Sequence, residues 1–250
     1  MPRANLIELN PALDLEKAGT EFAKFGRVQI VDFLTRNSAL QLREILENET
    51  PWGLVWRGAN MQEPELLRAE ALHSLPPQHM ASIRQTLSES MAGDEYAYCY
   101  STYPLVQALL EQWDPGGIHE DILASLNQAR ILDAVRRVTG IQDIVKADGQ
   151  ATLYRPGHFL AVHDDQEVQK GRRVAYVINL SGDLSGKPWR PEWGGSLQFL
   201  NADGAPDQTF LPKFNAISLF AVPQRHHVTS VSFFAPSTRY SITGWFRDRI

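Results

Sequence analysis

The sequence predicts an α+β fold in which an N-terminal helical part supports a C-terminal double-stranded β-helix, or jelly roll. Before about residue 145 the apolar residues mostly recur at helical spacing, and after it they follow the pattern of short strands. Many short strands without intervening helices favour a β-sandwich or a jelly roll. Because no Gly-, Ser- or Pro-rich linker divides the 250 residues, we expect one domain over 1–250, with residues 1–145 as the helical buttress and 146–250 as the core.

Three stripes at helical spacing predict helices in the first part. In the first, Leu42, Ile45, Leu46 and Glu49 follow this spacing, and the other two consist of apolar residues, namely Met80, Ile83, Leu87 and Met91, and Ile131, Leu132, Val135 and Val138. We expect Asn37 or Ser38 to cap the start of the first helix, Asn127 to cap the start of the third, and Gly140 to end the third. Short extended pieces are expected between the helices, at residues 28–31 and 52–56.

Five segments of the second part alternate, or are rich in β-branched and aromatic residues, and so predict strands. They are residues 151–154, 174–180, 196–200, 216–221 and 240–246. Turn-forming residues separate them, as in Arg155-Pro156-Gly157.

The bulk composition excludes several classes of protein. A net charge of −5 argues against a broad nucleic-acid surface. Cys99 is the only cysteine, so no intrachain disulfide can form, which suits a reducing compartment. The first residues lack the apolar segment of a secretory signal, and no run of about 18 apolar residues predicts a membrane span. We therefore expect a cytoplasmic protein without a membrane partner.

A set of metal-type ligands is the most informative feature of the chain. His163 and Asp165 lie two residues apart, and a histidine pair, His226-His227, follows about sixty residues later. Two histidines and a carboxylate can hold one face of a ferrous ion and leave the other open. On a strand, residues at i and i+2 share a face, so His163 and Asp165 should point together. His226 and His227 face opposite ways, and on spacing alone either can be the third ligand. A bare His-x-Asp is common by chance, so the complete set carries the prediction.

An arginine beyond the histidines predicts an anion site. Alternation places Arg239 and Ser241 on one face of a strand. An arginine inside an apolar barrel needs an anionic partner, and a dicarboxylate such as 2-oxoglutarate can accept two guanidinium hydrogen bonds. Ser241 can add a hydroxyl, and Tyr154 can reach the near end of the same molecule. The alternatives are an arginine paired on the surface and a tyrosine that only fills the core.

These residues resemble the prolyl 4-hydroxylase-like branch of the 2-oxoglutarate and Fe(II)-dependent oxygenases. The resemblance runs from about Ala151 to Phe246. Its motifs are Tyr154-Arg155-Pro156-Gly157, His163-Asp164-Asp165, Arg172-Arg173-Val174-Ala175-Tyr176, Trp193-Gly194-Gly195-Ser196-Leu197, His226-His227-Val228 and Arg239-Tyr240-Ser241-Ile242-Thr243-Gly244-Trp245-Phe246. The Trp-Gly-Gly segment and the Ile-Thr-Gly-Trp-Phe ending look most like the ribosomal-protein and translation-factor prolyl hydroxylases.

The resemblance implies an iron centre. Because the family carries its distal ligand in a His-x-Val pattern, it favours His226 and leaves His227 as the alternate. The implied iron ligands are then His163, Asp165 and His226. The implied cofactors are Fe(II), 2-oxoglutarate as co-substrate and O2, with ascorbate as a further candidate.

The resemblance also implies a co-substrate pocket. Arg239 would bind the C5 carboxylate of 2-oxoglutarate, Tyr154 would reach the C1 end, and Leu197 and Trp245 would line the pocket. The chain departs from the family at Asn179, where many relatives carry a tyrosine that helps to hold the C5 carboxylate. Asparagine can still donate a hydrogen bond there, although it reaches less far.

The implied reaction is hydroxylation of a prolyl residue in a protein or peptide, with succinate and CO2 as co-products. Loops at residues 166–172 and 182–192 are the expected lid, and Trp189 and Trp193 are expected to be exposed on the second loop. The first alternative is the same chemistry on a free amino acid, a small metabolite or a nucleobase. The second is a metal-free jelly-roll binding module without catalysis. The sequence leaves the oligomeric state open.

Overall fold

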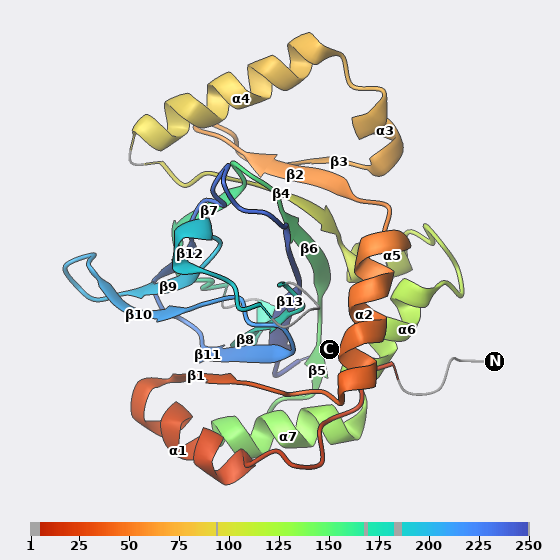
Figure 1. The fold of residues 1–250 in the computed structure, drawn as a ribbon, viewed down its shortest axis with the longest axis vertical. Coiled ribbons are helices and arrows are strands. Elements are labelled where there is room, and N and C mark those ends of the chain that lie inside the picture. Colours follow the sequence, from red (N-terminus) through yellow and green to blue (C-terminus); the bar gives the residue numbers. More distant parts are fainter. Residues whose placement is uncertain (1–5, 94, 168–169, 183–186, 250) are drawn as a thin grey trace.

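The strands form a nearly closed antiparallel barrel in the computed structural model, which describes residues 6–93, 95–167, 170–182 and 187–249 (Figure 1). Within these ranges the strands follow the order β1-β11-β8-β13-β6-β4-β7-β12-β9-β10, with β2 and β3 beside β4 and β5 beside β13. The order interleaves strands that are distant along the chain. The predicted double-stranded β-helix is confirmed.

The strands of the barrel are short. Their bounds are β1 Arg27–Ile30, β2 Gly53–Arg57, β3 Glu65–Leu67, β4 Tyr98–Tyr103, β5 Lys146–Ala147, β6 Gln150–Tyr154, β7 Phe159–His163, β8 Arg172–Asn179, β9 Leu197–Leu200, β10 Pro206–Phe210, β11 Ala216–Ala221, β12 His226–Val228 and β13 Arg239–Arg247. The strands β6, β13, β8 and β11 form one half of the barrel, and β7, β12, β9 and β10 form the other.

A compact apolar cluster fills the space between the two halves. It contains Tyr100, Tyr154, Ala175, Val177, Leu197, Phe199, Phe210, Phe220, Val228 and Val231. Phe199 is fully buried and meets both Phe210 and Phe220 edge-on, with ring centroids 5.4 and 5.1 Å apart. Seven of these residues, among them Leu197, Phe220 and Val228, also line the cavity described below.

Helices cover the outside of the barrel on three sides (Figure 1). They are α1 Leu15–Phe25, α2 Arg36–Asn48, α3 Ala69–His73, α4 Pro77–Ala92, α5 Leu105–Leu110, α6 Ile118–Leu126 and α7 Ala129–Thr139, with a 3₁₀ turn, η2, at Pro191–Trp193. The helices α1, α2, α6 and α7 share a large core with the outward residues of β6, β8 and β13. The helix α4 lies apart, across β2 and β4. No helix in the described ranges is long and apolar enough to span a bilayer.

The predicted helix at residues 42–49 is confirmed as α2, but its cap is not Asn37 or Ser38. The side chain of Thr35 caps the helix by accepting a hydrogen bond from the Ser38 backbone N–H at 3.4 Å. The Ser38 hydroxyl instead accepts from the Glu8 backbone at 3.1 Å, which joins the helix to the preceding chain.

The predicted cap of the third helix is also wrong, because Asn127 ends α6 rather than starting α7. Its side-chain amide donates to Leu123 and to the Ala147 carbonyl, and its oxygen accepts from the Ala147 N–H at 2.8 Å. Asn127 therefore ties a helix end to β5. Gly140 ends α7 as predicted, with φ of 73°, a conformation that glycine adopts without a Cβ clash.

The first part of the chain is less helical than predicted. The extended pieces at 28–31 and 52–56 are confirmed as β1 and β2, but β3 and β4 were missed. β4 lies inside the barrel sheet, where it pairs with both β6 and β7. Residues 1–145 therefore supply part of the barrel wall as well as its buttress. In the second part all five predicted strands are present, whereas β5, β7, β10 and β12 were missed.

Candidate metal and co-substrate site

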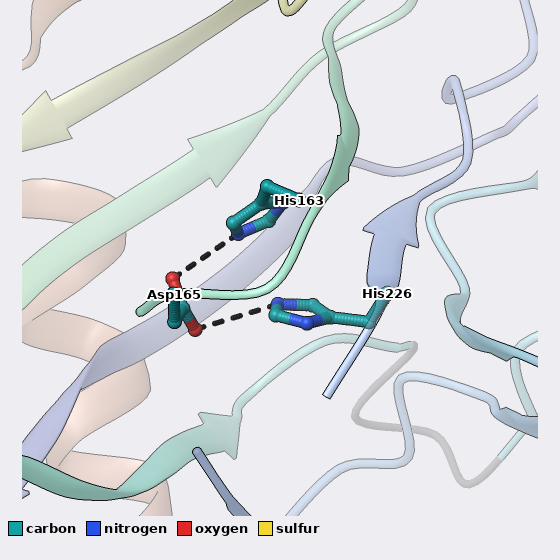
Figure 2. A group of neighbouring side chains, drawn as sticks. All are labelled: His163, Asp165 and His226. Atoms are coloured by element: carbon teal, nitrogen blue, oxygen red, sulfur yellow. Dashed lines mark ion pairs between the residues drawn. The ribbon is translucent and has the colours of Figure 1, made fainter. Parts of the chain in front are cut away.

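Three metal-type ligands face one another at one end of the barrel. His163 lies at the end of β7, Asp165 lies two residues later, and His226 opens β12 (Figure 2). The Nε2 atoms of His163 and His226 lie 3.2 and 3.5 Å from the two carboxylate oxygens of Asp165. All three ligand atoms fall within 4.8 Å of one another.

The backbone brings Asp165 into this group in a way that strand alternation did not predict. β7 ends at His163, and Asp165 has φ of 63°, in the left-handed region that L-residues adopt in few turns. The carboxylate therefore meets the imidazoles because the chain turns sharply, and not because His163 and Asp165 share a strand face. The juxtaposition predicted from the spacing is present, but the reason given for it is wrong.

The structure separates His226 from His227. β12 pairs with β7 so that His226 lies opposite His163, and the His226 side chain is buried within the barrel. His227 points the other way, where its Nε2 lies 3.0 Å from the Gln198 side-chain oxygen. Only His226 reaches the carboxylate of Asp165.

Hydrogen bonds fix both imidazoles with Nε2 toward the carboxylate. The Nδ1 atoms of His163 and His226 lie 2.9 and 2.8 Å from the backbone carbonyls of Ala161 and Gln224. A carbonyl can only accept, so each Nδ1 carries the proton and each Nε2 keeps its lone pair. This backbone support is the usual second layer of a histidine metal ligand.

The electrostatics of the cluster favour a neutral imidazole and an ionised carboxylate. Burial, followed by the neighbouring His163, lowers the pKa of His226 to about 4. Burial raises the pKa of Asp165, but its neighbours His163, His226 and Arg172 together hold that pKa below its usual value. Two neutral nitrogens and a carboxylate oxygen form the donor set that suits Fe(II) and leaves coordination positions free. The residues present therefore fit an iron ion.

The cluster opens into a cavity of about 370 Å³. Tyr154, Leu197, Arg239 and Trp245, four of the six residues predicted to bind the co-substrate, line it together with the three ligands. Arg239 and Tyr154 lie side by side because they are register partners between β13 and β6.

Arg239 is a buried cation without a carboxylate partner among the described residues. It is 2% exposed, and its guanidinium lies 4.8 Å from the centre of the Tyr154 ring. Its Nε has no hydrogen-bond partner in the described part of the chain. Burial lowers the pKa of Arg239, and the neighbouring Tyr154 partly opposes this. Such a charge calls for an anion from outside the chain.

The other two predicted co-substrate residues do not line the cavity. Ser241 is fully buried, and its hydroxyl is 2.7 Å from the Thr152 hydroxyl. Asn179 is the register partner of Ser241 and is also buried, and its Oδ1 has no partner among the described residues. Asn179 therefore keeps an unused acceptor near Arg239, on the neighbouring strand β8.

Three tyrosines that the sequence reasoning missed line the cavity beside Tyr154. Tyr96, Tyr98 and Tyr100 form a row on and just before β4, with successive ring centroids 5.4 and 5.7 Å apart. Tyr100 stacks on Tyr154 at 5.1 Å, and Tyr96 lies 5.5 Å from the His163 ring. We name these four tyrosines the tyrosine wall. The period-two spacing of residues 96, 98 and 100 is the strand signal that could have revealed it.

Charged side chains line the outer part of the cavity. Glu167 contacts both Lys170 and Arg172, at 2.5 and 2.9 Å. Arg57 and Glu63 bring a further pair of opposite charges from β2 and the loop after it. None of these charged residues was predicted to lie in the same cavity as the metal-type ligands.

The two predicted lid loops are only partly described, because residues 168–169 and 183–186 lie outside the described ranges. Trp189 is 4% exposed rather than exposed as predicted, since its indole N–H donates to the Gly194 carbonyl at 2.8 Å. Its ring packs edge-on against Trp193 at 5.5 Å. Trp189 is therefore a structural anchor of its loop.

Residues 149–247 match the family model described as the 2OG-Fe(II) oxygenase superfamily. The prolyl 3-hydroxylase sudestada1 of Drosophila melanogaster is 34% identical to this chain over 124 residues, which are 45% of this chain and 22% of the relative. The chain thus spans about a fifth of the length of that relative. The family resemblance predicted from the sequence is confirmed.

Solved structures share the fold over nearly the whole chain. A prolyl-4-hydroxylase of Pseudomonas putida is 20% identical with a TM-score of 0.54, and the match covers 94% of this chain and 100% of that one. A prolyl hydroxylase of Trichoplax adhaerens, in complex with a hypoxia inducible factor peptide fragment, is 15% identical with a TM-score of 0.56, over 96% and 94% of the two chains. At these identities the similarity shows the fold.

Proposed function

We propose that this chain, whose residues 149–247 belong to the 2OG-Fe(II) oxygenase superfamily, is a 2-oxoglutarate- and Fe(II)-dependent dioxygenase that hydroxylates a prolyl residue in a protein or peptide. One observation carries the proposal. A single cavity holds both a His-Asp-His cluster and the buried cation Arg239, which has no carboxylate partner among the described residues. A metal site alone would need no such cation, and an anion site alone would need no such cluster.

Each residue has a defined part in this proposal. His163, Asp165 and His226 would hold the iron, which supplies the redox chemistry that couples O2 and decarboxylation of 2-oxoglutarate to substrate hydroxylation. Arg239 would bind the far carboxylate of 2-oxoglutarate with two charge-assisted hydrogen bonds. Tyr154 would hydrogen-bond the near end of the same molecule.

The apolar lining would keep water out of the reaction. Leu197 and Val228 are 3% and 6% exposed and lie beside the cluster, while Trp245 covers the cavity from β13. A dry site strengthens the contacts of every charged group inside it. Asn179 and Ser241 remain candidates for supporting the lining residues from behind, because both are buried on the strands that carry the pocket.

The tyrosine wall supports a ring-shaped, uncharged substrate group. Burial raises the pKa of Tyr96, Tyr98 and Tyr100, so their phenols stay neutral. A prolyl ring is compact and apolar, and its fixed φ leaves little entropy to lose on binding. Of the relatives named above, one is called a prolyl 3-hydroxylase, one a prolyl-4-hydroxylase and one a prolyl hydroxylase. We therefore propose a prolyl substrate and leave the hydroxylated carbon open.

A free amino acid is the second candidate, and one observation favours it. Arg57 and Glu63 place opposite charges at the outer part of the cavity, where they could receive a carboxylate and an ammonium group. The sequence alone had not brought these two residues to the site. A peptide has no such charges beside its prolyl ring, so the two candidates differ in their dependence on Arg57 and Glu63.

The test is an assay of anaerobically prepared, Fe(II)-loaded protein with 2-oxoglutarate and O2. One arm receives a proteome extract from the host, and the other receives free proline. We expect succinate in the first arm and, by peptide mass spectrometry, prolyl residues that have gained one oxygen. The same assay without ascorbate tests the candidate reductant.

The matched control is His226→Ala, which should give no succinate in either arm. Hydroxylated free proline without modified protein would replace the prolyl-peptide proposal with the second candidate. A hydroxylated residue other than proline would keep the oxygenase and replace the substrate. Absence of iron binding together with absence of succinate would favour the non-catalytic module. We also propose a cytoplasmic location, which the lone Cys99 supports.

A further inference from the structure

The sharp turn at Asp165 needs support from outside itself. Asp165 is one of five non-glycine residues with positive φ in the described chain. Non-glycine residues remain in this region only where the surroundings hold them there. Within the turn, the Asp164 carboxylate accepts from the Gln166 N–H at 3.0 Å, but this contact leaves the Asp165 carbonyl free.

Arg172 supplies that support from the first position of β8. Its Nη1 donates to the Asp165 carbonyl oxygen at 3.3 Å and also lies 2.9 Å from a Glu167 carboxylate oxygen. The guanidinium carbon lies 3.5 Å from the centre of the Trp245 ring on β13. Arg172 thus joins the turn that carries Asp165 to a rigid strand of the barrel.

We infer that Arg172 is a positioning residue for the metal site: it fixes the left-handed turn that aims the Asp165 carboxylate at His163 and His226. The inference rests on the proposed function, because it assumes that these three residues hold a metal. In this arrangement the planar face of the guanidinium packs on Trp245 while one edge holds the Asp165 carbonyl. A planar fork can make both contacts at once, whereas an ammonium group cannot.

The next residue along the chain provides a matched control. Arg173 faces the opposite side of β8, where its side chain is 43% exposed. It contacts the surface carboxylates of Asp143 and Asp248 at 3.3 and 3.7 Å and does not line the cavity. Removing Arg173 changes the net charge as much as removing Arg172 does, without touching the Asp165 turn.

A rival role for Arg172 is direct contact with a ligand. It lines the cavity, and its Nε has no partner among the described residues. A purely ligand-binding arginine would affect co-substrate or substrate affinity only. A positioning arginine would affect metal affinity even when no co-substrate or substrate is present.

The experiment therefore measures Mn(II) binding to the full chain without 2-oxoglutarate, from the electron paramagnetic resonance signal of free Mn(II). We expect Arg172→Met, which keeps an apolar contact with Trp245 but loses the donor, to weaken Mn(II) binding by about 10- to 100-fold. Arg172→Lys keeps a donor and should fall between Arg172→Met and the wild type. Arg173→Met should bind Mn(II) like the wild type.

A second readout separates a displaced ligand from a general loss of folding. At saturating Co(II), the ligand-field absorption of Arg172→Met should differ from that of the wild type, because the carboxylate approaches the metal differently. If Arg172→Met fails to fold, Arg172→Lys carries both measurements. Wild-type Mn(II) affinity and an unchanged Co(II) spectrum in the folded variant would overturn the inference. Failure of the wild type to bind Mn(II) would instead overturn the proposed function.

Discussion

Replacing Arg239 by methionine should have two opposite effects, because the arginine is a buried cation that awaits a ligand. Methionine keeps a long unbranched side chain and removes the charge. Without ligands, the wild type buries a guanidinium that is 2% exposed and whose Nε has no partner among the described residues. Relief of that unpaired charge should stabilise the ligand-free variant by about 1 kcal/mol or more. For a chain of this size that corresponds to a melting temperature about 2–4 °C higher per kcal/mol.

The same replacement should nearly abolish 2-oxoglutarate binding. A lost contact to a desolvated carboxylate costs roughly 2–5 kcal/mol, since the carboxylate is left unpaired. At about 1.4 kcal/mol per tenfold, the dissociation constant should rise from about 30-fold to several thousand-fold. Arg239→Lys should lie between the variant and the wild type, because lysine lacks the planar fork.

Thermal melting with Mn(II), in the presence and absence of 2-oxoglutarate, measures both effects. At a ligand concentration one hundred times the dissociation constant, the wild type should gain about 2.7 kcal/mol, or roughly 5–10 °C. Arg239→Met should gain less than about 1 kcal/mol at that concentration, because its dissociation constant is at least about 30-fold higher. A wild-type response in the variant would refute the co-substrate assignment. A ligand-free variant that melts several degrees below the wild type would refute the unpaired-charge argument.

Three further predictions concern other residues. His226→Ala should abolish iron-dependent succinate formation while His227→Ala retains it, as measured by chromatography; the reverse pattern would overturn the assignment of the distal ligand. Burial lowers the pKa of His158 to about 4 from the usual 6.5. The contribution of its neutral form to the free energy of unfolding is therefore fully present above pH 6.5. About 3 kcal/mol of that free energy should be lost as the pH falls from 6.5 to 4. Urea unfolding at pH 7 and pH 5 should show a smaller difference in His158→Gln than in the wild type, and an equal difference would contradict this. Phe199→Ala should lower the free energy of unfolding by about 3–5 kcal/mol and Phe199→Leu by less; equal losses would show that the site collapses around either side chain.

The strands that could be predicted from the sequence are mainly buried ones, because burial favours apolar residues along the whole strand. β8 and β11 are buried along nearly their whole length and consist mostly of apolar residues. β12 has only three residues, and β10, with the sequence PDQTF, is mostly exposed. Neither length nor composition separates such strands from loops, because cross-strand pairing holds them in place rather than local preference. β4 could have been predicted, since its tyrosines alternate.

In the candidate site, the types of residue could be predicted from the sequence, but the register between the strands that carry them could not. The residue types at positions 163, 165, 226 and 239 were enough to predict a metal and an anion. Which histidine faces inward depends on the pairing of β12 with β7 and β9, and the meeting of Arg239 with Tyr154 depends on the register of β13 with β6. Register is a property of two strands together. The left-handed turn at Asp165 could not be predicted because aspartate only tolerates that conformation.

The interleaved strand order also determines when the barrel can form. β4 lies between β6 and β7, and β1 pairs with β11 although Val28 and Leu219 are about 190 residues apart along the chain (Figure 1). Pairings of such long sequence separation pay their loop-closure entropy before they gain any contact, so folding should be slow. During synthesis, β1 presents an open hydrogen-bonding edge until β11 emerges, and β4, which pairs with β2 on one side, does so on its other side until β6 and β7 emerge. We therefore expect the nascent chain to depend on chaperones, and a fragment limited to residues 149–247, which lacks both early strands, to aggregate rather than bind metal.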